Sequence, residues 1–137
     1  MTAEQMAAHI TELTAQLEIA VDYTYKGRCG GRAWARRKCI WIRPVKSSVT
    51  YAVALHEIGH CAVGKIAPKV GRLSEEGAAW KWAKNNANDW TDTMENKMVK
   101  SLESYVNSYQ HRERRGRKVK WPQPDDFVWA TITRPTN

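Results

Sequence analysis

Residues 56–60 read His-Glu-Ile-Gly-His, and this spacing constrains the chain more than any other feature of the sequence. Residues four apart lie one above the other on one face of an α-helix. In a helix, His56 and His60 therefore present two imidazoles that can bind one Zn²⁺, at roughly 2.0–2.1 Å each. Glu57 is turned by about 100° around the helix axis, and from there its carboxylate can activate a water molecule without binding the metal. The pattern predicts a helix that carries a catalytic zinc site.

The residues around this motif support a helix. Ser47 or Ser48 can cap its start, and Gly64 and Pro68 bracket its end. Its apolar residues recur at helical spacing: Tyr51, Leu55, Ile58 and Ala62. Gly59 costs about 1 kcal/mol in a helix interior relative to Ala, so we expect another element to pack close to the backbone there.

A zinc site of this kind needs a third protein ligand. The longer histidine pattern H-E-x-x-H-x-x-G-x-x-H fails, because Val63 and Ile66 stand where Gly and the third His would be. The remaining histidines, His9 and His111, lie far from the motif in the sequence. A carboxylate is therefore favoured as the third ligand. The candidates are Glu75, Glu76, Asp89, Asp92 and Glu95.

Glu75 and Glu76 open a helix predicted over about 75–87, with Ser74 as its cap. Glu76 shares a face with three alanines that would let this helix approach the motif helix closely: Ala79, Ala83 and Ala87. Glu75 is almost as well placed by spacing alone. Each of the two could also be an ordinary acidic residue favoured by the helix dipole in a first turn.

The rest of the chain predicts a mixed α+β domain. Thr2 and Gln5 form a capping box at the start of a helix predicted over 2–18, and β-forming residues predict a strand over 19–25 and a β segment over 32–43 that is clearest at Cys39–Ile42. Apolar residues at helical spacing predict a further helix over about 91–114. The rest, 115–137, is predicted to be an extended tail with a short strand at 127–132. We therefore divide the chain into a domain over 1–114 and a basic, Pro-containing tail over 115–137.

Charge and cysteine content narrow the class of protein. The net charge is +8, and the basic run Arg112–Lys120 could contact nucleic acid phosphates or could be a solvated tail. Trp121 and Trp129 could stack on bases, but we expect them to fold the tail back over the core. Three cysteines do not indicate a disulfide framework. Cys29 and Cys39 could pair across a hairpin or join a second metal site, but we expect free thiols in a reducing cytoplasm. Cys61 directly follows His60 on the helix, so we expect it to be buried and to point away from the metal face. Without a signal peptide or a membrane-length apolar run, the expected location is the cytoplasm.

Several matched segments together resemble one enzyme family. Residues 30–33 (Gly-Gly-Arg-Ala), the β segment through Ile42, and the motif helix from Tyr51 resemble the ImmA/IrrE-like zinc metallopeptidases, and the segment from Glu76 to Ala83 resembles the third-ligand helix of that family. The resemblance covers roughly residues 25–87. Compact members of this kind are common in phages and mobile elements. Larger members can carry an additional DNA-binding domain, and we expect none in this sequence.

The resemblance implies a zincin-like domain in which an N-terminal helix and a small sheet pack on the motif helix and the third-ligand helix. It implies Zn²⁺ held by His56, His60 and Glu76, with Glu57 as the catalytic base. The expected function is hydrolysis of peptide bonds in a protein substrate, such as a regulatory or repressor protein. The alternative is a non-catalytic zinc-containing module that binds nucleic acid or a host regulatory protein through its basic surface. Five residues are of a type that can stabilise an oxyanion, and the sequence favours none of them: Arg32, Tyr51, Tyr105, Tyr109 and His111.

Overall fold

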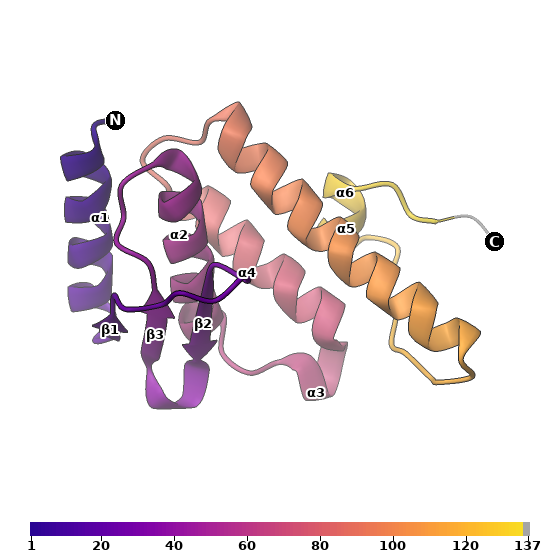
Figure 1. Cartoon of the computed structure of the whole chain (residues 1–137). Helices are drawn as coiled ribbons and strands as arrows, with labels where there is room; N and C mark the ends of the chain where they lie inside the picture. The colour runs from indigo at the N-terminus through magenta and orange to yellow at the C-terminus, as the bar shows by residue number, and fades with distance from the viewer. Residues whose placement is uncertain (136–137) are drawn as a thin grey trace.

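The computed structural model describes residues 1–135 and has an α+β architecture (Figure 1). Its elements in chain order are α1 (Ala3–Gln16), β1 (Ala20–Asp22), β2 (Gly31–Trp34), the 3₁₀ turn η1 (Ala35–Arg37), β3 (Cys39–Ile42), α2 (Ser48–Val63), α3 (Ala67–Val70), α4 (Arg72–Asn86), α5 (Asp92–Arg114) and α6 (Phe127–Thr131). Within residues 1–135, no helix is both long and apolar enough to cross a membrane.

A three-stranded sheet lies beside the helices in the order β1-β3-β2. The central strand β3 pairs in parallel with β1 and antiparallel with β2, with Ile40 opposite Val21 and Ala33. Ile40 and Ile42 point into the core, as period-2 alternation requires. This arrangement leaves β2 as an edge strand.

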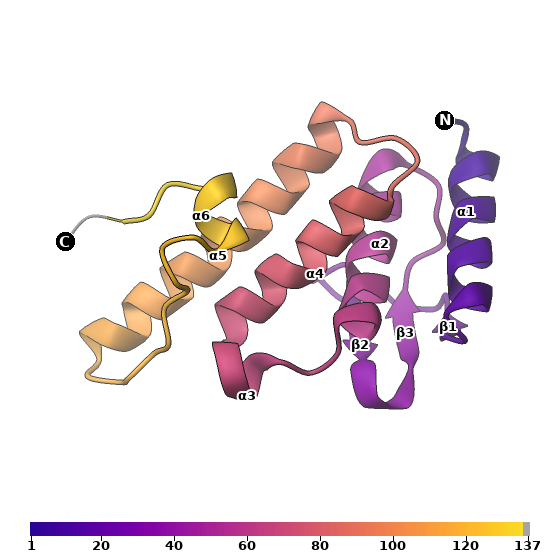
Figure 2. The ribbon, with the colours of Figure 1, turned by 180° about the vertical axis from the view of Figure 1, so that it is seen from behind.

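The helix that carries the His-Glu-His motif, α2, lies between the sheet and α4 (Figure 2). Ser47 caps it through a capping box with Thr50, and Gly64 ends it at φ 85°. Tyr51, Leu55 and Ile58 are buried as predicted. The prediction for Ala62 is wrong, because this residue at the end of α2 is exposed.

The contact between α2 and α4 is a close approach of two backbones. A Cβ atom added to Gly59 would lie 2.5 Å from the carbonyl oxygen of Ala79, and Ala79 and Ala83 are fully buried. The predicted close packing at Gly59 is confirmed, and so is the predicted small-residue face at Ala79 and Ala83. The prediction for Ala87 is wrong, because this residue follows the last residue of α4 and is only half-buried. We call this contact, centred on Gly59 and Ala79, the seam between α2 and α4. It brings side chains of α2 and α4 close to one another.

The predicted start of the Glu76 helix is wrong. The helix α4 begins at Arg72, with no side-chain cap, and Ser74 is buried inside it. Gly71 takes a φ of 90°, a conformation that glycine adopts without steric cost, and the chain turns there from the short helix α3 directly into α4. Glu76 therefore lies one turn deeper in the helix than expected.

The C-terminal segment packs over the core rather than extending away from it. Trp121 contacts Tyr109 edge-on at 5.2 Å between ring centroids, and Trp121 and Trp129 both lie against the buried cluster, as predicted for them. The predicted strand at 127–132 is wrong: Phe127–Thr131 form α6, capped by Asp126, and Val128 is buried. Val128 packs on α4 at Gly77. A helical turn buries this side chain while its backbone groups bond within the turn, whereas a strand here would need a neighbouring strand to pair with.

Candidate metal centre

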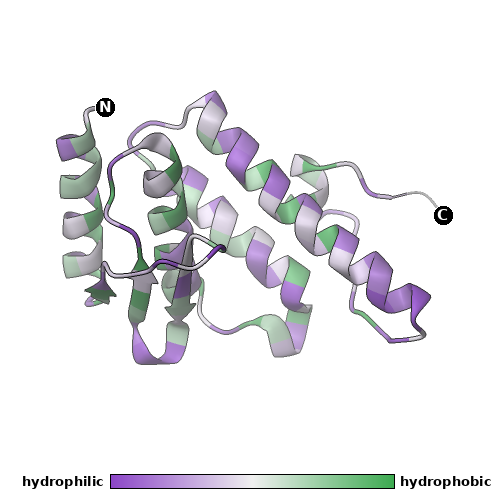
Figure 3. Ribbon diagram, viewed as in Figure 1, coloured by the Kyte–Doolittle hydropathy of each residue, from purple (hydrophilic) through white to green (hydrophobic). Residues whose placement is uncertain are grey.

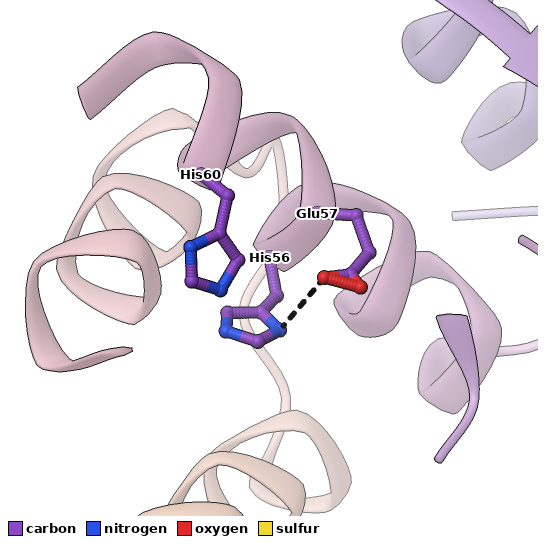
Figure 4. A group of neighbouring side chains, drawn as sticks. All are labelled: His56, Glu57 and His60. Carbon is purple, nitrogen blue, oxygen red and sulfur yellow. Dashed lines mark ion pairs between the residues drawn. The ribbon is translucent and has the colours of Figure 1, made fainter. Parts of the chain in front are cut away.

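The three residues of the motif project from α2 as a compact group. Ligand atoms of His56, Glu57 and His60 all lie within 4.8 Å of one another. Figure 4 shows the two imidazole rings side by side and the Glu57 carboxylate next to the His56 ring, with Oε1 of Glu57 3.7 Å from Nδ1 of His56. The rings of His56 and His60 meet edge-on at 4.6 Å between centroids. The helical prediction for the motif is therefore confirmed, and both imidazoles face the same side.

Glu76 of α4 meets both imidazoles from across the seam. Its Oε2 atom lies 2.8 Å from Nε2 of His56 and 3.0 Å from Nε2 of His60, and the residue is only 1% exposed. Two three-residue donor sets are thus close enough to share an ion, one with Glu57 and one with Glu76. We favour the set with Glu76, because its single oxygen faces the same nitrogen of both rings, whereas Glu57 contacts His56 on the opposite ring nitrogen.

Two further side chains hold the other oxygen of Glu76. The Tyr105 hydroxyl donates a hydrogen bond to Oε1 at 2.8 Å, and Nη2 of Arg72 lies 3.3 Å from the same atom. These contacts orient the carboxylate, as outer partners do for metal ligands. Arg72 is not among the predicted site residues, although its i,i+4 spacing from Glu76 is a usable signal. Tyr105 is predicted only as a possible oxyanion group and not as a partner of Glu76, because the approach of α5 to α4 depends on tertiary packing.

The environment sets the protonation of the buried groups. Burial raises the pKa of the Glu57 carboxyl, although the neighbouring imidazoles oppose this shift. Burial would also raise the pKa of Glu76, but its hydrogen bonds to His56 and His60 outweigh that effect and hold its pKa well below the usual range. Burial of Tyr105 next to the Glu76 charge raises the pKa of its hydroxyl to about 12. Glu76 is therefore ionised at neutral pH, and Tyr105 keeps the proton that it donates.

His56 and Glu57 are held by packing as well as by polar contacts. The His56 ring stacks on Trp80 with centroids 4.2 Å apart and planes 8° apart. On the sheet side, a Cβ atom added to Gly31 would lie 3.1 Å from Cγ of Glu57, so the β2 backbone approaches Glu57 closely. Glycine at position 31 makes that approach possible. Both side chains thus have little freedom to rotate.

The other candidate carboxylates have different partners. Oε2 of Glu75 accepts a hydrogen bond from the backbone N–H of Ala67 at 2.7 Å. Asp89 lies 4.0 Å from the N-terminal ammonium, Asp92 is exposed at the start of α5, and Glu95 pairs with Lys84 at 2.9 Å. Glu76 is therefore the one of the five predicted candidates that contacts both imidazoles.

The site lies at the floor of a cleft of about 850 Å³. Among the five residues considered for an oxyanion, Tyr105 and Arg32 line this cleft. The hydroxyls of Tyr51 and Tyr109 accept backbone hydrogen bonds from Asn88 and Leu73 in the interior. His111 is exposed near the end of α5. The structure thus reduces these five residues to two that a substrate in the cleft can reach.

The residues of the basic run Arg112–Lys120 are not among those that line this cleft. The run lies at the end of α5 and in the loop that follows, where the chain is largely hydrophilic (Figure 3). Its side chains are exposed except for the half-buried Val119, and the Lys120 ammonium donates to the carbonyl of Lys69. All three cysteines are free thiols, as predicted for Cys29 and Cys39, and Cys61 is half-buried rather than buried. Cys61 lies outside the cleft lining, and its Sγ is 4.0 Å from the carbonyl oxygen of Cys39.

Comparison with known proteins adds no relative to this picture. No protein-family model, curated protein or solved structure matches the chain.

Proposed function

We propose that this protein is a zinc-dependent metallopeptidase with a zincin-like domain, and that it binds Zn²⁺ through His56, His60 and Glu76. The observation that carries the proposal is the single Glu76 oxygen that faces Nε2 of both histidines at 2.8 and 3.0 Å. Two imidazole nitrogens and one carboxylate oxygen are a donor set typical of catalytic zinc. The set fits the ion in charge as well, since Glu76 is buried and ionised beside two imidazoles. The resemblance to the ImmA/IrrE-like family agrees with this proposal.

In this proposal, one side chain transfers a proton at the scissile bond and others hold the metal ligand Glu76 in position. Zinc, when bound, supplies a Lewis acid that polarises a carbonyl and acidifies water. Glu57 lies beside the ligand residues and lines the cleft, and its raised pKa makes it a better proton acceptor. It removes a proton from the attacking water and delivers that proton to the leaving amine. Tyr105 and Arg72 hold the Glu76 carboxylate in place.

The cleft also suits an extended peptide. Strand β2 is an edge of the sheet, and its four residues line the cleft next to Glu57. Edge strands bind extended peptides through backbone hydrogen bonds. We place the peptide along β2 because the backbone of this strand at Gly31 lies next to the Glu57 side chain, so that a bound carbonyl would lie near this carboxylate. Peptide hydrolysis in a protein substrate, such as a cytoplasmic regulatory or repressor protein, is the reaction that this arrangement supports best.

Metal content tests the zinc site. We expect about one zinc per chain by mass spectrometry of the purified wild type, little or none in Glu76→Ala, and a full complement in Glu75→Ala. Glu75 is the matched control, because it is the neighbouring buried carboxylate and bonds to Ala67 instead. A wild type that takes up no zinc even after reconstitution would overturn the proposal.

Hydrolysis tests the catalytic role. Glu57→Gln should keep its zinc and lose activity on a broad peptide and protein panel by about 10²–10⁴-fold, the usual contribution of a general base. If the zinc-loaded wild type cleaves nothing that Glu57→Gln leaves intact, the peptidase assignment is wrong.

A second candidate is a zinc-containing module that binds nucleic acid without catalysis. It is favoured by the exposed basic run Arg112–Lys120, whose Lys and Arg side chains have no carboxylate within 4.0 Å among residues 1–135. Such binding would weaken steeply with salt. A gel shift that disappears when this run is neutralised, yet persists in Glu57→Gln, would favour this candidate. The lack of any salt-sensitive shift would exclude it.

A further inference from the structure

The residues around the cleft are strongly biased towards positive charge. Eight basic side chains line it against three acidic ones. The three carboxylates are Glu57, Glu75 and Glu76, and all are at most 5% exposed. The negative charge is thus confined to the buried floor, and the charge that an incoming molecule meets first is positive.

One group of these cations surrounds the edge strand. Arg28 precedes β2, Arg32 lies on it, and Arg36 and Arg37 lie on η1 directly after it. All four are exposed and line the cleft. Figure 3 shows this turn between β2 and β3 as a hydrophilic end of the sheet. A peptide that pairs with β2 would therefore run along a row of guanidinium groups.

A second group comes from the helices. Lys65 follows α2, Arg72 begins α4, and Lys97 and Lys100 lie on α5. Lys65, Arg72 and Lys100 are exposed, and Lys97 is half-buried. Cations from the sheet and from three helical segments thus meet around one cleft, although they are far apart in the sequence.

These charges are mostly uncompensated within the protein. Among residues 1–135, Arg72 is the one cation of the eight that has a carboxylate within 4.0 Å, and its partner is Glu76. A cleft lined by charges of one sign focuses the field and attracts ligands of the opposite sign. The seven remaining cations therefore favour an anionic ligand that the protein itself does not supply.

An acidic peptide fits this distribution better than a nucleic acid does. A nucleic acid carries charge along its whole backbone, and along the floor of the cleft this backbone would meet three buried carboxylates. An extended peptide places a neutral backbone along the floor and the edge strand. Its side chains alternate in direction every residue, so acidic ones can reach the seven remaining cations around the cleft, which we call the rim.

We infer that the cleft selects acidic polypeptide segments as substrates, and that the rim cations Arg36 and Arg37 are specificity determinants. This inference rests on the proposed peptidase activity and names its substrate class. The segment binds extended along β2, with Asp or Glu side chains facing η1 and α5.

Peptide binding is measured by fluorescence anisotropy on zinc-loaded Glu57→Gln, so that the peptide is not turned over. Two extended peptides are compared that are identical except that alternate positions carry Glu in one and Gln in the other. We expect the Glu peptide to bind at least about tenfold more tightly, within the range that electrostatic focusing supplies. The added double change Arg36→Glu/Arg37→Glu should remove this preference. Lys46→Glu/Lys81→Glu is the matched control, because it changes the net charge equally at exposed positions outside the cleft, and it should retain the preference.

Equal binding of the Glu and Gln peptides would overturn the inference. So would a single-stranded oligonucleotide that displaces the Glu peptide and binds more tightly in the same salt. Cleavage of matched Glu, Gln and Lys peptide pools by the wild type separates the two proposals. If all pools are cleaved equally, the peptidase assignment holds and the substrate class is wrong. If the acidic peptide binds selectively but no pool is cleaved, the surface inference holds and the peptidase assignment fails.

Discussion

The floor and the rim of one cleft carry charge in opposite ways. On the floor, the charged group Glu76 is almost fully buried and each of its oxygens has two partners. On the rim, side chains such as Arg36 and Arg37 are exposed and have no carboxylate partner within residues 1–135. Buried charges must be paired to be tolerated, whereas exposed charges cost little. The floor is therefore preorganised, and the rim is free to engage a ligand.

This comparison predicts that a change at the helix seam under the floor has the largest effect. Gly59→Ala should destabilise the fold by about 1–3 kcal/mol, the usual cost of overpacking, because its methyl group would overlap the Ala79 carbonyl. Helix propensity alone predicts the opposite sign, a gain of about 1 kcal/mol. The variant should also bind zinc more weakly, since α2 and α4 must separate. Chemical denaturation and zinc titration measure both effects, and a stabilised variant would show that the seam is looser than the structure indicates.

The next largest effect, on zinc affinity, is expected at a residue that contacts a proposed ligand without binding the metal itself. Tyr105→Phe removes the hydroxyl that donates to Glu76 and should weaken zinc binding by about 10–100-fold, as for other outer partners of metal ligands.

Tyr109→Phe is its control on the same helix. It loses the hydroxyl that accepts from the Leu73 N–H and should cost about 1 kcal/mol of stability with unchanged zinc affinity. Competition with a chelator of known affinity measures the metal, and equal zinc affinity in both variants would mean that Tyr105 does not orient Glu76.

A half-exposed ion pair should matter less than either. Burial would raise the pKa of Glu95, but hydrogen bonds from Lys84 and Trp90 lower it below the usual value. A lowered folded-state pKa stabilises the fold above the unfolded-state pKa, and the contribution disappears as pH falls through the folded-state value. We expect less than about 1 kcal/mol after solvent screening. Thermal melts of wild type and Glu95→Gln should therefore differ at pH 7 and converge in acid, and a constant difference would argue against this linkage.

The rim should have the smallest effect on stability. Arg36→Glu/Arg37→Glu should change the free energy of unfolding by no more than about 0.5 kcal/mol, as is usual for exposed positions. Lys46→Glu/Lys81→Glu should show an equally small change in the free energy of unfolding, and chemical denaturation measures both variants. A large loss in the rim variant alone would show that these arginines support the fold, and the contrast between floor and rim would no longer hold.

Local rules explain which predictions about the fold were accurate. The helix caps at Thr2 and Ser47 and the apolar spacing of α1, α2 and α5 depend on residues within one or two turns, and the structure has those helices. The strand predicted at 127–132 is wrong, because these β-forming residues make a short helix in which Val128 packs against Gly77. The start of α4 was wrong because Ser74 offered a plausible cap, while the turn at Gly71 depends on how α3 packs.

The sequence by itself determined the chemistry available on α2. Four-residue spacing in a helix necessarily aligns His56 with His60, and Gly59 already indicated a close neighbour. Only the tertiary structure decided which carboxylate meets the two imidazoles, that Tyr105 and Arg72 hold that carboxylate, and that cations from four parts of the chain surround one cleft. The physical reason is that helical geometry relates near neighbours in the sequence, whereas contacts between α2, α4 and α5 depend on how complete side-chain surfaces pack together.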